Sequence, residues 1–418
     1  MTEDEVRAQY EAYPYPPRNP RDEAARLMEG SPSHILEINH YLFAGARDFT
    51  RPFRALVAGG GTGDGLVMLA QQLAEARCPA QLHYLDLSDA SRRIAQARIA
   101  QRGLESVVFH SGAIEDLPKL GLGLFDYIDC CGVLHHLADP EAGLAILAGA
   151  LEPEGGIGLM VYGELGRTGV YPMQALLRML SEGEPAPKRI EMAKRLLRQL
   201  PSTNWLLRNP ALGDHWRAGD AGLHDLLLHA RDRAYRVPEL MRLLDGAGLE
   251  PTGLIEPWRY EPASYLADSR LLDRFAHLDP WQRAAAAELI AGNLKTHIVY
   301  AVRKGRAGAA LARPGPSAVP VLKGMDGAAF ARTLKPGGRL TVAADGFEAR
   351  FAAPPGAGPI LGAVDGRRPI AEIAALLQSQ DPRRWAPERF GPEFEQTYLL
   401  FNRLNRLFLG GRPAKTGA

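Results

Sequence analysis

The sequence predicts an α/β fold, in which a seven-stranded, mostly parallel sheet carries a helical insertion and is followed by a small α+β C-terminal domain. Three observations point to it. Short apolar runs alternate with helical patterns through residues 51–304, as in strand–helix–strand units of a parallel sheet. The first run ends in a glycine-rich turn. A Gly/Ala/Pro-rich stretch over 305–320 predicts a linker to a second unit.

Seven apolar runs are predicted as strands, and the patterns between them as helices. The fifth strand follows a turn predicted over residues 153–156, Pro-Glu-Gly-Gly. The strands are expected over 55–58, 81–87, 107–110, 125–131, 157–162, 251–255 and 297–303. The connecting helices are expected over 66–76, 90–101, 141–151 and 237–246.

A helical insertion is predicted between the fifth and sixth strands, over about residues 164–236. Helical patterns occupy 173–180, 189–200 and 223–233, with no strand between them. Such an insertion would lie at the rim of the sheet, where loops carry function. It is therefore either a lid over a substrate or a helical decoration.

The length of 418 residues predicts two or three domains. Residues 1–50 are expected to form an N-terminal helical strap, 51–304 the sheet domain and 321–418 an accessory domain. In the accessory domain, 339–343 and 348–352 are predicted as a hairpin. A last helix over 393–409 presents one apolar face for core packing or a dimer contact, formed by Leu399, Leu400, Leu404, Leu407 and Phe408.

Charge is balanced overall and uneven along the chain. The 49 Lys and Arg against 48 Asp and Glu give +1, which argues against nucleic-acid binding through an overall field. From Gly305 onward there are 16 basic and 9 acidic residues, against 33 and 39 before it. The acidic part before Gly305 and the basic part after it are thus expected to face different surroundings.

The three cysteines, Cys78, Cys130 and Cys131, cannot form a disulfide framework and lack zinc-ligand spacing, so no metal is predicted. No apolar run approaches the ~18 residues of a membrane helix. The first residues lack the pattern of a signal peptide. We therefore expect a cytoplasmic protein without a membrane partner.

The sharpest motif is the turn Gly59-Gly60-Gly61-Thr62-Gly63, directly after a strand and before a helix. Glycines there let the backbone approach a ligand, and the helix N-terminus offers free N–H groups. A P-loop would need Gly-Lys-Ser/Thr, and here Leu66 follows Gly65. A dinucleotide fingerprint would need glycine at Asp64. A nucleoside ligand without a pyrophosphate fits best.

This turn resembles the first motif of class I S-adenosylmethionine-dependent methyltransferases, and the resemblance covers about residues 50–304. Asp86 ends the second strand in Tyr-Leu-Asp-Leu-Ser, and residues 112–118 resemble the segment that walls the adenine. Residues 125–128 and 132–137 resemble the fourth-strand motif of the superfamily. The resemblance implies a Rossmann-like fold and S-adenosyl-L-methionine as cofactor, with S-adenosyl-L-homocysteine (AdoHcy) as product.

The resemblance also implies a set of cofactor contacts. Asp86 would accept hydrogen bonds from both ribose hydroxyls. The expected cofactor-binding residues are Gly59, Gly60, Gly61, Thr62, Gly63, Asp86, Leu87, Ser88, Gly112, Ala113, Ile114, Cys131, Gly132 and His136. Two positions depart from the family: Val57 and Ala113 stand where an acidic residue is frequent.

His135 and Tyr162 are the candidate catalytic residues, because both lie near the carboxyl ends of predicted strands. His135 would act as a general base or pack at a helix start, and Tyr162 would contact the acceptor or simply end its strand. Cys130 and Cys131 point to opposite faces of one strand, so they are expected in the core.

A Tyr/Pro segment, residues 10–20, is held extended by its prolines. It resembles a segment that precedes the nucleotide domain in some bacterial methyltransferases. That resemblance implies that Tyr10, Tyr13 and Tyr15 wall the cofactor cleft; the alternative is a strap on the back of the domain.

Residues 358–373 of the C-terminal unit loosely resemble small winged-helix modules of peptide-binding chaperones and protein-modifying enzymes. The unit is therefore a solvated accessory or dimerisation domain, a protein- or peptide-binding domain, or an RNA-binding one. RNA is least favoured, because aromatic residues do not alternate with the arginines.

Together these patterns predict an enzyme that transfers a methyl group from S-adenosylmethionine to a protein, peptide or small molecule by in-line displacement. Two alternatives stay open from the sequence. One is a nicotinamide-dependent oxidoreductase, and the other is a non-catalytic regulatory protein that keeps the fold and binds the cofactor.

Overall fold

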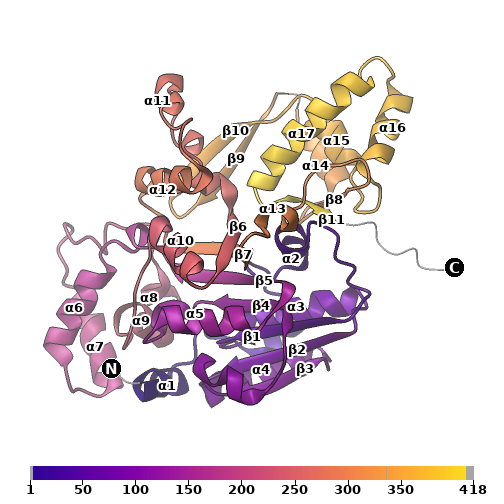
Figure 1. Ribbon diagram of the computed structural model, residues 1–418. Helices are drawn as coiled ribbons and strands as arrows, with labels where there is room; N and C mark the ends of the chain where they lie inside the picture. Colours follow the sequence, from indigo (N-terminus) through magenta and orange to yellow (C-terminus); the bar gives the residue numbers. More distant parts are fainter. Residues whose placement is uncertain (1–2, 336, 411–418) are drawn as a thin grey trace.

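A seven-stranded sheet lies at the centre of the computed structural model, which describes residues 3–335 and 337–410 (Figure 1). The strand order is β3-β2-β1-β4-β5-β7-β6, and all pairs are parallel except those made by β7. The strands are β1 (Phe53–Ala58), β2 (Ala80–Asp86), β3 (Val107–Ser111), β4 (Phe125–Cys131), β5 (Leu151–Tyr162), β6 (Leu249–Ile255) and β7 (Thr296–Arg303). The predicted fold class is confirmed.

The chain order reverses direction in the sheet between β1 and β4, which are neighbours although β2 and β3 separate them in sequence. In an open α/β sheet, a crevice opens beyond the carboxyl ends of the strands at such a switch point. The glycine turn after β1 and the segment after β4 therefore face the same space.

Helices cover both faces of the sheet, and an apolar cluster fills each layer. Phe53 and Leu56 of β1 are fully buried, as a central parallel strand requires. The main covering helices are α3 (Asp64–Glu75), α4 (Asp89–Gln101), α5 (Pro140–Gly149), α10 (Val237–Gly246) and α12 (Pro280–Ala291).

The turn expected at residues 153–156 lies inside β5, which begins at Leu151. The pairing of β5 with β4 shifts register between Leu151 and Gly156, so residues 152–155 form a bulge within the strand. A Cβ on Gly155 would lie 2.8 Å from the carbonyl oxygen of Phe125, and one on Gly156 would lie 2.6 Å from Leu42. These glycines therefore permit close packing of the chain at this bulge.

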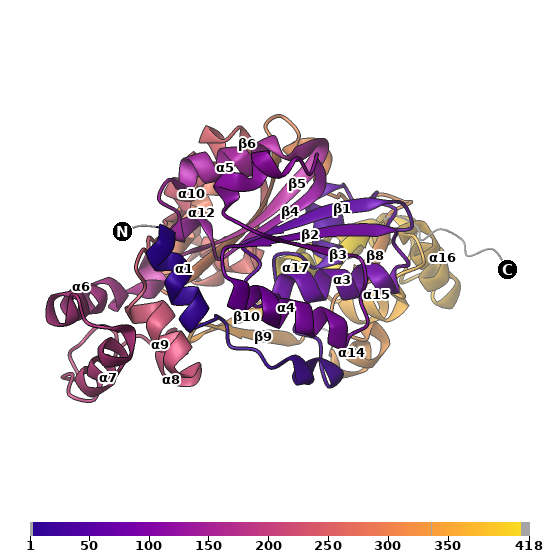
Figure 2. The same ribbon diagram turned by 90° about the horizontal axis from the view of Figure 1, so that it is seen from below.

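The insertion is helical, as predicted, and has an apolar core of its own. It comprises η4 (Leu165–Arg167), α6 (Val170–Ser181), α7 (Ala186–Leu197), α8 (Asp214–Arg217) and α9 (Gly219–Leu227). Its chain leaves after β5 and returns beside the same strand, where Gly163 and Tyr235 form a β-bridge. Figures 1 and 2 show it at the opposite side of the molecule from helices α15–α17.

The N-terminal part contains α1 (Glu3–Ala12), η1 (Pro20–Ala24) and α2 (Ile35–Leu42). Helix α1 lies between the insertion and α4 (Figure 2). Two backbone N–H groups at the start of α4, those of Asp89 and Ala90, donate to the carboxylate of Glu11. The N-terminal helix is thus tied to the sheet domain near the carboxyl end of β2.

In its described residues, the C-terminal unit contains two small antiparallel sheets and four helices. Its elements are β8 (Val319–Leu322), α14 (Gly327–Thr333), β9 (Arg339–Ala344), β10 (Phe347–Ala352), α15 (Ala357–Ala363), α16 (Ile370–Gln380), α17 (Pro387–Arg403) and β11 (Leu407–Gly410). Residues 411–418 of the expected accessory domain lie outside the described residues.

The last predicted helix is wrong at its end. Helix α17 stops at Arg403, and residues 407–410 form β11, which pairs antiparallel with β8. Asn405 has a φ of 59°, a left-handed conformation that ends the helix. Leu404, Leu407 and Phe408 are buried, whereas Leu399 is exposed.

The stretch expected to be a linker packs on the sheet domain. It contains the short helix α13 (Ala307–Ala310), and both Ala310 and Ala312 are buried. The N–H of Ala312 donates to the carbonyl of His40 at 2.8 Å. Within residues 3–335 and 337–410, no helix is long and apolar enough to cross a membrane.

Candidate functional site

A cavity of about 650 Å³ opens at the carboxyl edge of the sheet, beyond β1, β2, β3 and β4. Most residues expected from the sequence to form the site line it. These are Tyr10, Tyr15, Gly59, Gly60, Gly61, Thr62, Gly63, Asp86, Leu87, Gly112, Ala113, Ile114, Cys131, Gly132, His136 and Tyr162. Tyr13, Ser88 and His135 are not among the lining residues.

The glycine turn supplies one wall of the cavity. Gly59 and Gly61 have φ values of 67° and 51°, which other residues rarely adopt. A Cβ on Gly59 would lie 2.3 Å from Val133, and one on Gly60 would lie 2.4 Å from the ring of Tyr84. The turn leads into α3, so a ligand in the cavity meets bare backbone there.

Asp86 lies at the end of β2 with both carboxylate oxygens fixed. One accepts the N–H of Gly61 at 2.7 Å, and the other accepts the N–H of Ser88 at 2.8 Å. Each oxygen has a second acceptor site, and Asp86 lines the cavity. Burial raises the pKa of Asp86. Ser88 itself is buried away from the cavity and caps α4 through the N–H of Ser91.

Ala113 and Ile114 form an apolar wall after β3, and both are almost fully buried. The N–H of Ala113 donates to the carboxylate of Asp116 at 3.2 Å. An apolar wall of this kind suits the flat face of a purine base.

An acidic residue that the sequence reasoning missed lies beside Val57. In the parallel pair β1–β4, Val57 is in register with Asp129, which lines the cavity. Asp129 is 1% exposed, and its Oδ2 accepts a hydrogen bond from Ser33 at 2.5 Å. Its Oδ1 has no hydrogen-bond partner among the described residues. Burial raises the pKa of Asp129 to about 6.

Tyr162, at the end of β5, is held from both faces. The imidazole of His135 stacks on its ring at 3.8 Å, and the guanidinium of Arg167 lies 3.8 Å from the ring centroid. Arg167 is itself buried and paired with Asp232 at 2.6 Å. The ring of Tyr162 therefore has a fixed position at the cavity.

His135 is fully buried behind Tyr162, and neither of its ring nitrogens has a hydrogen-bond partner among the described residues. Burial lowers its pKa well below the ordinary value. These surroundings favour a packing role for His135 over that of a general base. His136 lines the cavity instead, and its Nδ1 lies 2.7 Å from the carbonyl oxygen of Arg231.

The insertion contributes a carboxylate to the cavity that the sequence did not single out. Asp225 of α9 accepts hydrogen bonds from the hydroxyls of Tyr10 and Tyr162, at 3.3 and 3.0 Å. The hydroxyl of Tyr10 also lies 3.1 Å from Nε2 of His229. We call Tyr10, Tyr162, Asp225 and His229 the tyrosine–carboxylate cluster.

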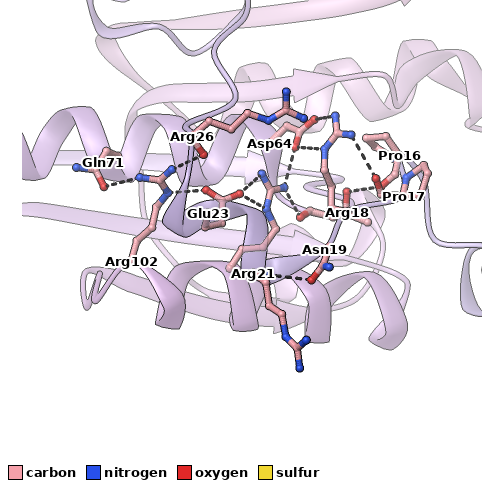
Figure 3. A network of polar contacts seen from close by, with 12 residues as sticks. Pro16, Pro17, Arg18, Asn19, Arg21, Glu23, Arg26, Asp64, Gln71 and Arg102 are labelled. Atoms are coloured by element: carbon pink, nitrogen blue, oxygen red, sulfur yellow. Dashed lines mark hydrogen bonds and ion pairs between the residues drawn. The ribbon is translucent and has the colours of Figure 1, made fainter.

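The Tyr/Pro segment crosses the cavity and is fastened to the glycine turn. Arg18 makes a two-pronged ion pair with Asp64, at 2.8 and 2.5 Å (Figure 3). The hydroxyl of Thr62 donates to the carbonyl of Pro16 at 2.8 Å. Tyr13 points away from the cavity and stacks on His224 of the insertion, with ring centroids 5.1 Å apart.

A second group of contacts fixes the chain beyond this segment. Glu23 of η1 pairs with Arg102, which caps the end of α4, at 2.5 Å (Figure 3). The fully buried Arg98 bridges Glu23 and Asp64, at 2.7 Å to each. Because Asp64 begins α3, the same carboxylate holds both the segment and the helix that follows the glycine turn.

Comparisons with known proteins agree with this geometry. A family model for a methyltransferase domain matches residues 56–157. An uncharacterised protein of Synechococcus is 32% identical over 298 residues, which are 68% of each chain. A ubiquinone biosynthesis O-methyltransferase of Xanthomonas axonopodis is 31% identical over 124 residues, which are 30% of this chain and 49% of that enzyme.

A solved structure is similar over nearly the whole chain. PKMT2 from Rickettsia typhi, in complex with AdoHcy, superposes with a TM-score of 0.57 at 15% identity, covering 96% of this chain and 76% of that one. At this identity the likeness concerns the fold. It includes the insertion and the C-terminal unit, since it extends well beyond the sheet domain.

Proposed function

The chain belongs to the class I S-adenosylmethionine-dependent methyltransferases, and from this premise we propose that it methylates a protein, peptide or small molecule bound between the Tyr/Pro segment and the insertion. The observation that supports the proposal is that one cavity is lined by the glycine turn, by Asp86 and by three members of the tyrosine–carboxylate cluster, Tyr10, Tyr162 and Asp225. The membership sets aside the oxidoreductase and the non-catalytic alternatives.

The cavity fits the cofactor in shape and in donor set. We place the methionine part against Gly59, Gly61 and Gly63, the ribose at Asp86 and the adenine at Ala113 and Ile114. The bare glycine backbone and the two free acceptor sites of Asp86 support this placement.

We assign the α-amino group of the cofactor to Asp129. The family often has an acidic residue at the position of Val57, and Asp129 is its neighbour on the adjacent strand. The buried Oδ1 has no hydrogen-bond partner among the described residues, so a cationic amine would meet an acceptor there. The carboxylate of Asp129 on β4 can thus take the place of the acidic residue that is absent at Val57 on β1.

The chain's own contribution to catalysis is positioning. When bound, the cofactor supplies a sulfonium methyl group, which is already a strong electrophile. Tyr15 and Pro16 of the Tyr/Pro segment line the cavity, while His135 and Arg167 fix Tyr162. Holding an acceptor in line with the methyl group then supplies most of the acceleration.

Calorimetric titration with AdoHcy tests the cofactor placement. Asp86→Ala is expected to weaken binding about tenfold or more, because two ribose hydroxyls lose their acceptor. Asp89→Ala is the matched control, since its carboxylate contacts Arg92 and Ser111 at the surface. Unchanged affinity in Asp86→Ala would show that the ribose is misplaced.

The class of acceptor is tested by incubating a cell extract with radiolabelled cofactor and separating the products by size. Label in protein favours a macromolecular acceptor, and label in metabolites favours a small one. We propose a cytoplasmic setting, in keeping with three unpaired cysteines. Nucleic acid is the least favoured acceptor, because the net charge is only +1.

A further inference from the structure

Asp225 is a buried carboxylate at the acceptor side of the cavity, and the placement of the cofactor leaves it unused. It is 4% exposed and belongs to α9, an element of the insertion rather than of the sheet domain. Burying a carboxylate is costly unless it is well hydrogen-bonded. The hydrogen-bond partners of Asp225 therefore indicate its role.

Each oxygen of Asp225 has one hydroxyl donor from the protein. Tyr10 donates to Oδ1 and Tyr162 donates to Oδ2. These two bonds leave acceptor sites on both oxygens, and Asp225 lines the cavity. A third donor, belonging to a bound molecule, can therefore reach the same carboxylate.

The tautomer of His229 explains why the hydroxyl of Tyr10 donates to Asp225. The backbone N–H of Arg231 donates to Nδ1 of His229 at 3.0 Å, so the neutral ring carries its proton on Nε2. That Nε2–H points at the oxygen of Tyr10, whose own proton is then free to go to Asp225. His136, Asp225 and His229 are close enough to hold a metal ion, but this tautomer turns Nε2 into a donor rather than a ligand.

We propose that Asp225 binds the acceptor atom and takes its proton during methyl transfer, so that the acceptor is an amine or hydroxyl that carries a proton. The inference rests on the proposed function and assigns the acceptor half of the same cavity. Tyr10 and Tyr162 act as positioning residues, because they hold the carboxylate and not the acceptor.

The acceptor, the cofactor and Asp225 together account for every bond and proton in the methyl transfer. The acceptor heteroatom uses a lone pair to bond the methyl carbon, and the carbon–sulfur bond breaks with its electron pair left on sulfur. The proton of the acceptor passes to Asp225, which later releases it to solvent. No oxidant, reductant or further reactant is needed.

The surroundings of Asp225 set the pH range in which it can accept a proton. Burial raises its pKa to about 6, while Arg167 and the hydroxyl of Tyr162 oppose that rise. The carboxylate is therefore ionised at neutral pH and protonated in mild acid. The titratable and charged groups that face it are Tyr10 of α1, Tyr15 of the Tyr/Pro segment, His136 after β4, Tyr162 of β5, Arg167 of η4, and His229 and Asp232 after α9.

The test compares Asp225→Asn with Asp220→Asn, the same change at the exposed face of the same helix. Two quantities are measured for each protein: AdoHcy affinity by calorimetry, and transfer of radiolabelled methyl groups to a cell extract between pH 5 and 9. We expect AdoHcy affinity to stay within about twofold in both variants. Label transfer should fall about a hundredfold or more in Asp225→Asn alone.

A second variant, Tyr162→Phe, keeps the inference testable if Asp225→Asn does not fold. Losing this hydroxyl removes a donor to the ionised carboxylate, so the acid limb of the pH profile should move to higher pH. The wild-type profile should fall below about pH 6. An acid limb that stays in place in Tyr162→Phe would contradict the role of Asp225.

The outcomes separate the inference from the function on which it rests. If Asp225→Asn transfers label as the wild type does, or if the label is found on a sulfonium formed from a thioether, which has no proton to lose, Asp225 is not the proton acceptor. If Asp225→Asn loses AdoHcy affinity, the carboxylate belongs to the cofactor side. If wild-type protein neither binds AdoHcy nor labels the extract, the proposed function fails and the inference fails with it. Base-labile label identifies a carboxylate oxygen, which carries no proton at neutral pH, and would contradict the inference; base-stable label on an amine or an alcohol supports it.

Discussion

Single residues of this site differ in how visible they are in the sequence. Gly59 and Asp86 belong to local patterns whose spacing repeats across a superfamily, so the sequence points to them directly. Asp129 and Asp225 do not, because their roles depend on neighbours far away in the chain. Asp129 is visible only as an acid inside the apolar run 125–131, and its place beside Val57 follows from strand register. Asp225 needs the insertion to fold before it meets Tyr10 and Tyr162.

Asp129→Asn is expected to change stability in opposite directions with and without ligand. In the free protein, burial raises the pKa of Asp129 to about 6, above the unfolded value of about 3.9. The folded state then holds the proton more tightly, so ionisation destabilises it as pH rises between those values, by about 1.4 kcal/mol for each pKa unit. Without AdoHcy, the gain in Tm of the variant over wild type should therefore be larger at pH 7.5 than at pH 4.5.

With AdoHcy at pH 7.5, the same variant should gain less Tm from the ligand than wild type does, because the amino group loses its ionic partner. Thermal scans with and without AdoHcy measure both effects. Equal ligand-induced shifts in the two proteins would remove Asp129 from the cofactor site. A difference between variant and wild type that does not change with pH would show that the carboxylate is not held protonated in mild acid.

At the scale of elements, amphipathic periodicity predicted the sheet and its helices, because burial against one core imposes a period on each. Periodicity gave a wrong prediction where a contact with a distant segment determines the backbone conformation. Residues 404–409 continue the apolar pattern of α17, yet the left-handed Asn405 ends the helix and β8 offers a strand edge. Glycines at 155 and 156 indicated a turn between two elements, whereas in the structure they lie at a bulge inside β5, where Phe125 and Leu42 pack closely.

The Tyr/Pro segment is fastened to the glycine turn by an ion pair and a hydrogen bond, in addition to the packing of Tyr13 on the insertion. Arg18→Ala is expected to loosen it, because the two-pronged pair with Asp64 is lost while Arg98 still neutralises that carboxylate. The Arg18–Asp64 pair is partly exposed, so its loss should lower the free energy of unfolding by about 1 kcal/mol. The clearer effect should be a several-fold faster release of AdoHcy, measured by stopped-flow displacement. Arg21→Ala, an exposed arginine of η1, should release it at the wild-type rate.

At the scale of the whole molecule, the C-terminal unit is joined to the sheet domain through buried polar groups of α2. His40 accepts the N–H of Leu409 at 3.1 Å and contacts the hydroxyl of Tyr398. Glu37 is fully buried and pairs with Lys323, directly after β8. The excess of positive charge after Gly305 therefore includes a lysine that neutralises a carboxylate of the acidic part. This contact depends on two distant segments, and the sequence contains no local signal for it.

Because of these buried contacts, we expect the sheet domain and the C-terminal unit to unfold together. Burial alone would raise the pKa of Glu37, but Lys323 and the donors Ser31 and Asn405 bring it below its ordinary value. Lys323→Met removes the cation and leaves a buried charge, which should cost about 3–5 kcal/mol in a single unfolding transition. The double change Glu37→Gln with Lys323→Met should recover most of that loss, since no unpaired charge remains. Lys304→Met, at an exposed pair with Asp245, should cost under about 1 kcal/mol. Denaturant titration measures the free energy of unfolding of all three variants. Equal losses in Lys323→Met and Lys304→Met would contradict the prediction, and so would two separate transitions in the wild type. Either result would mean that the C-terminal unit unfolds independently of the sheet domain.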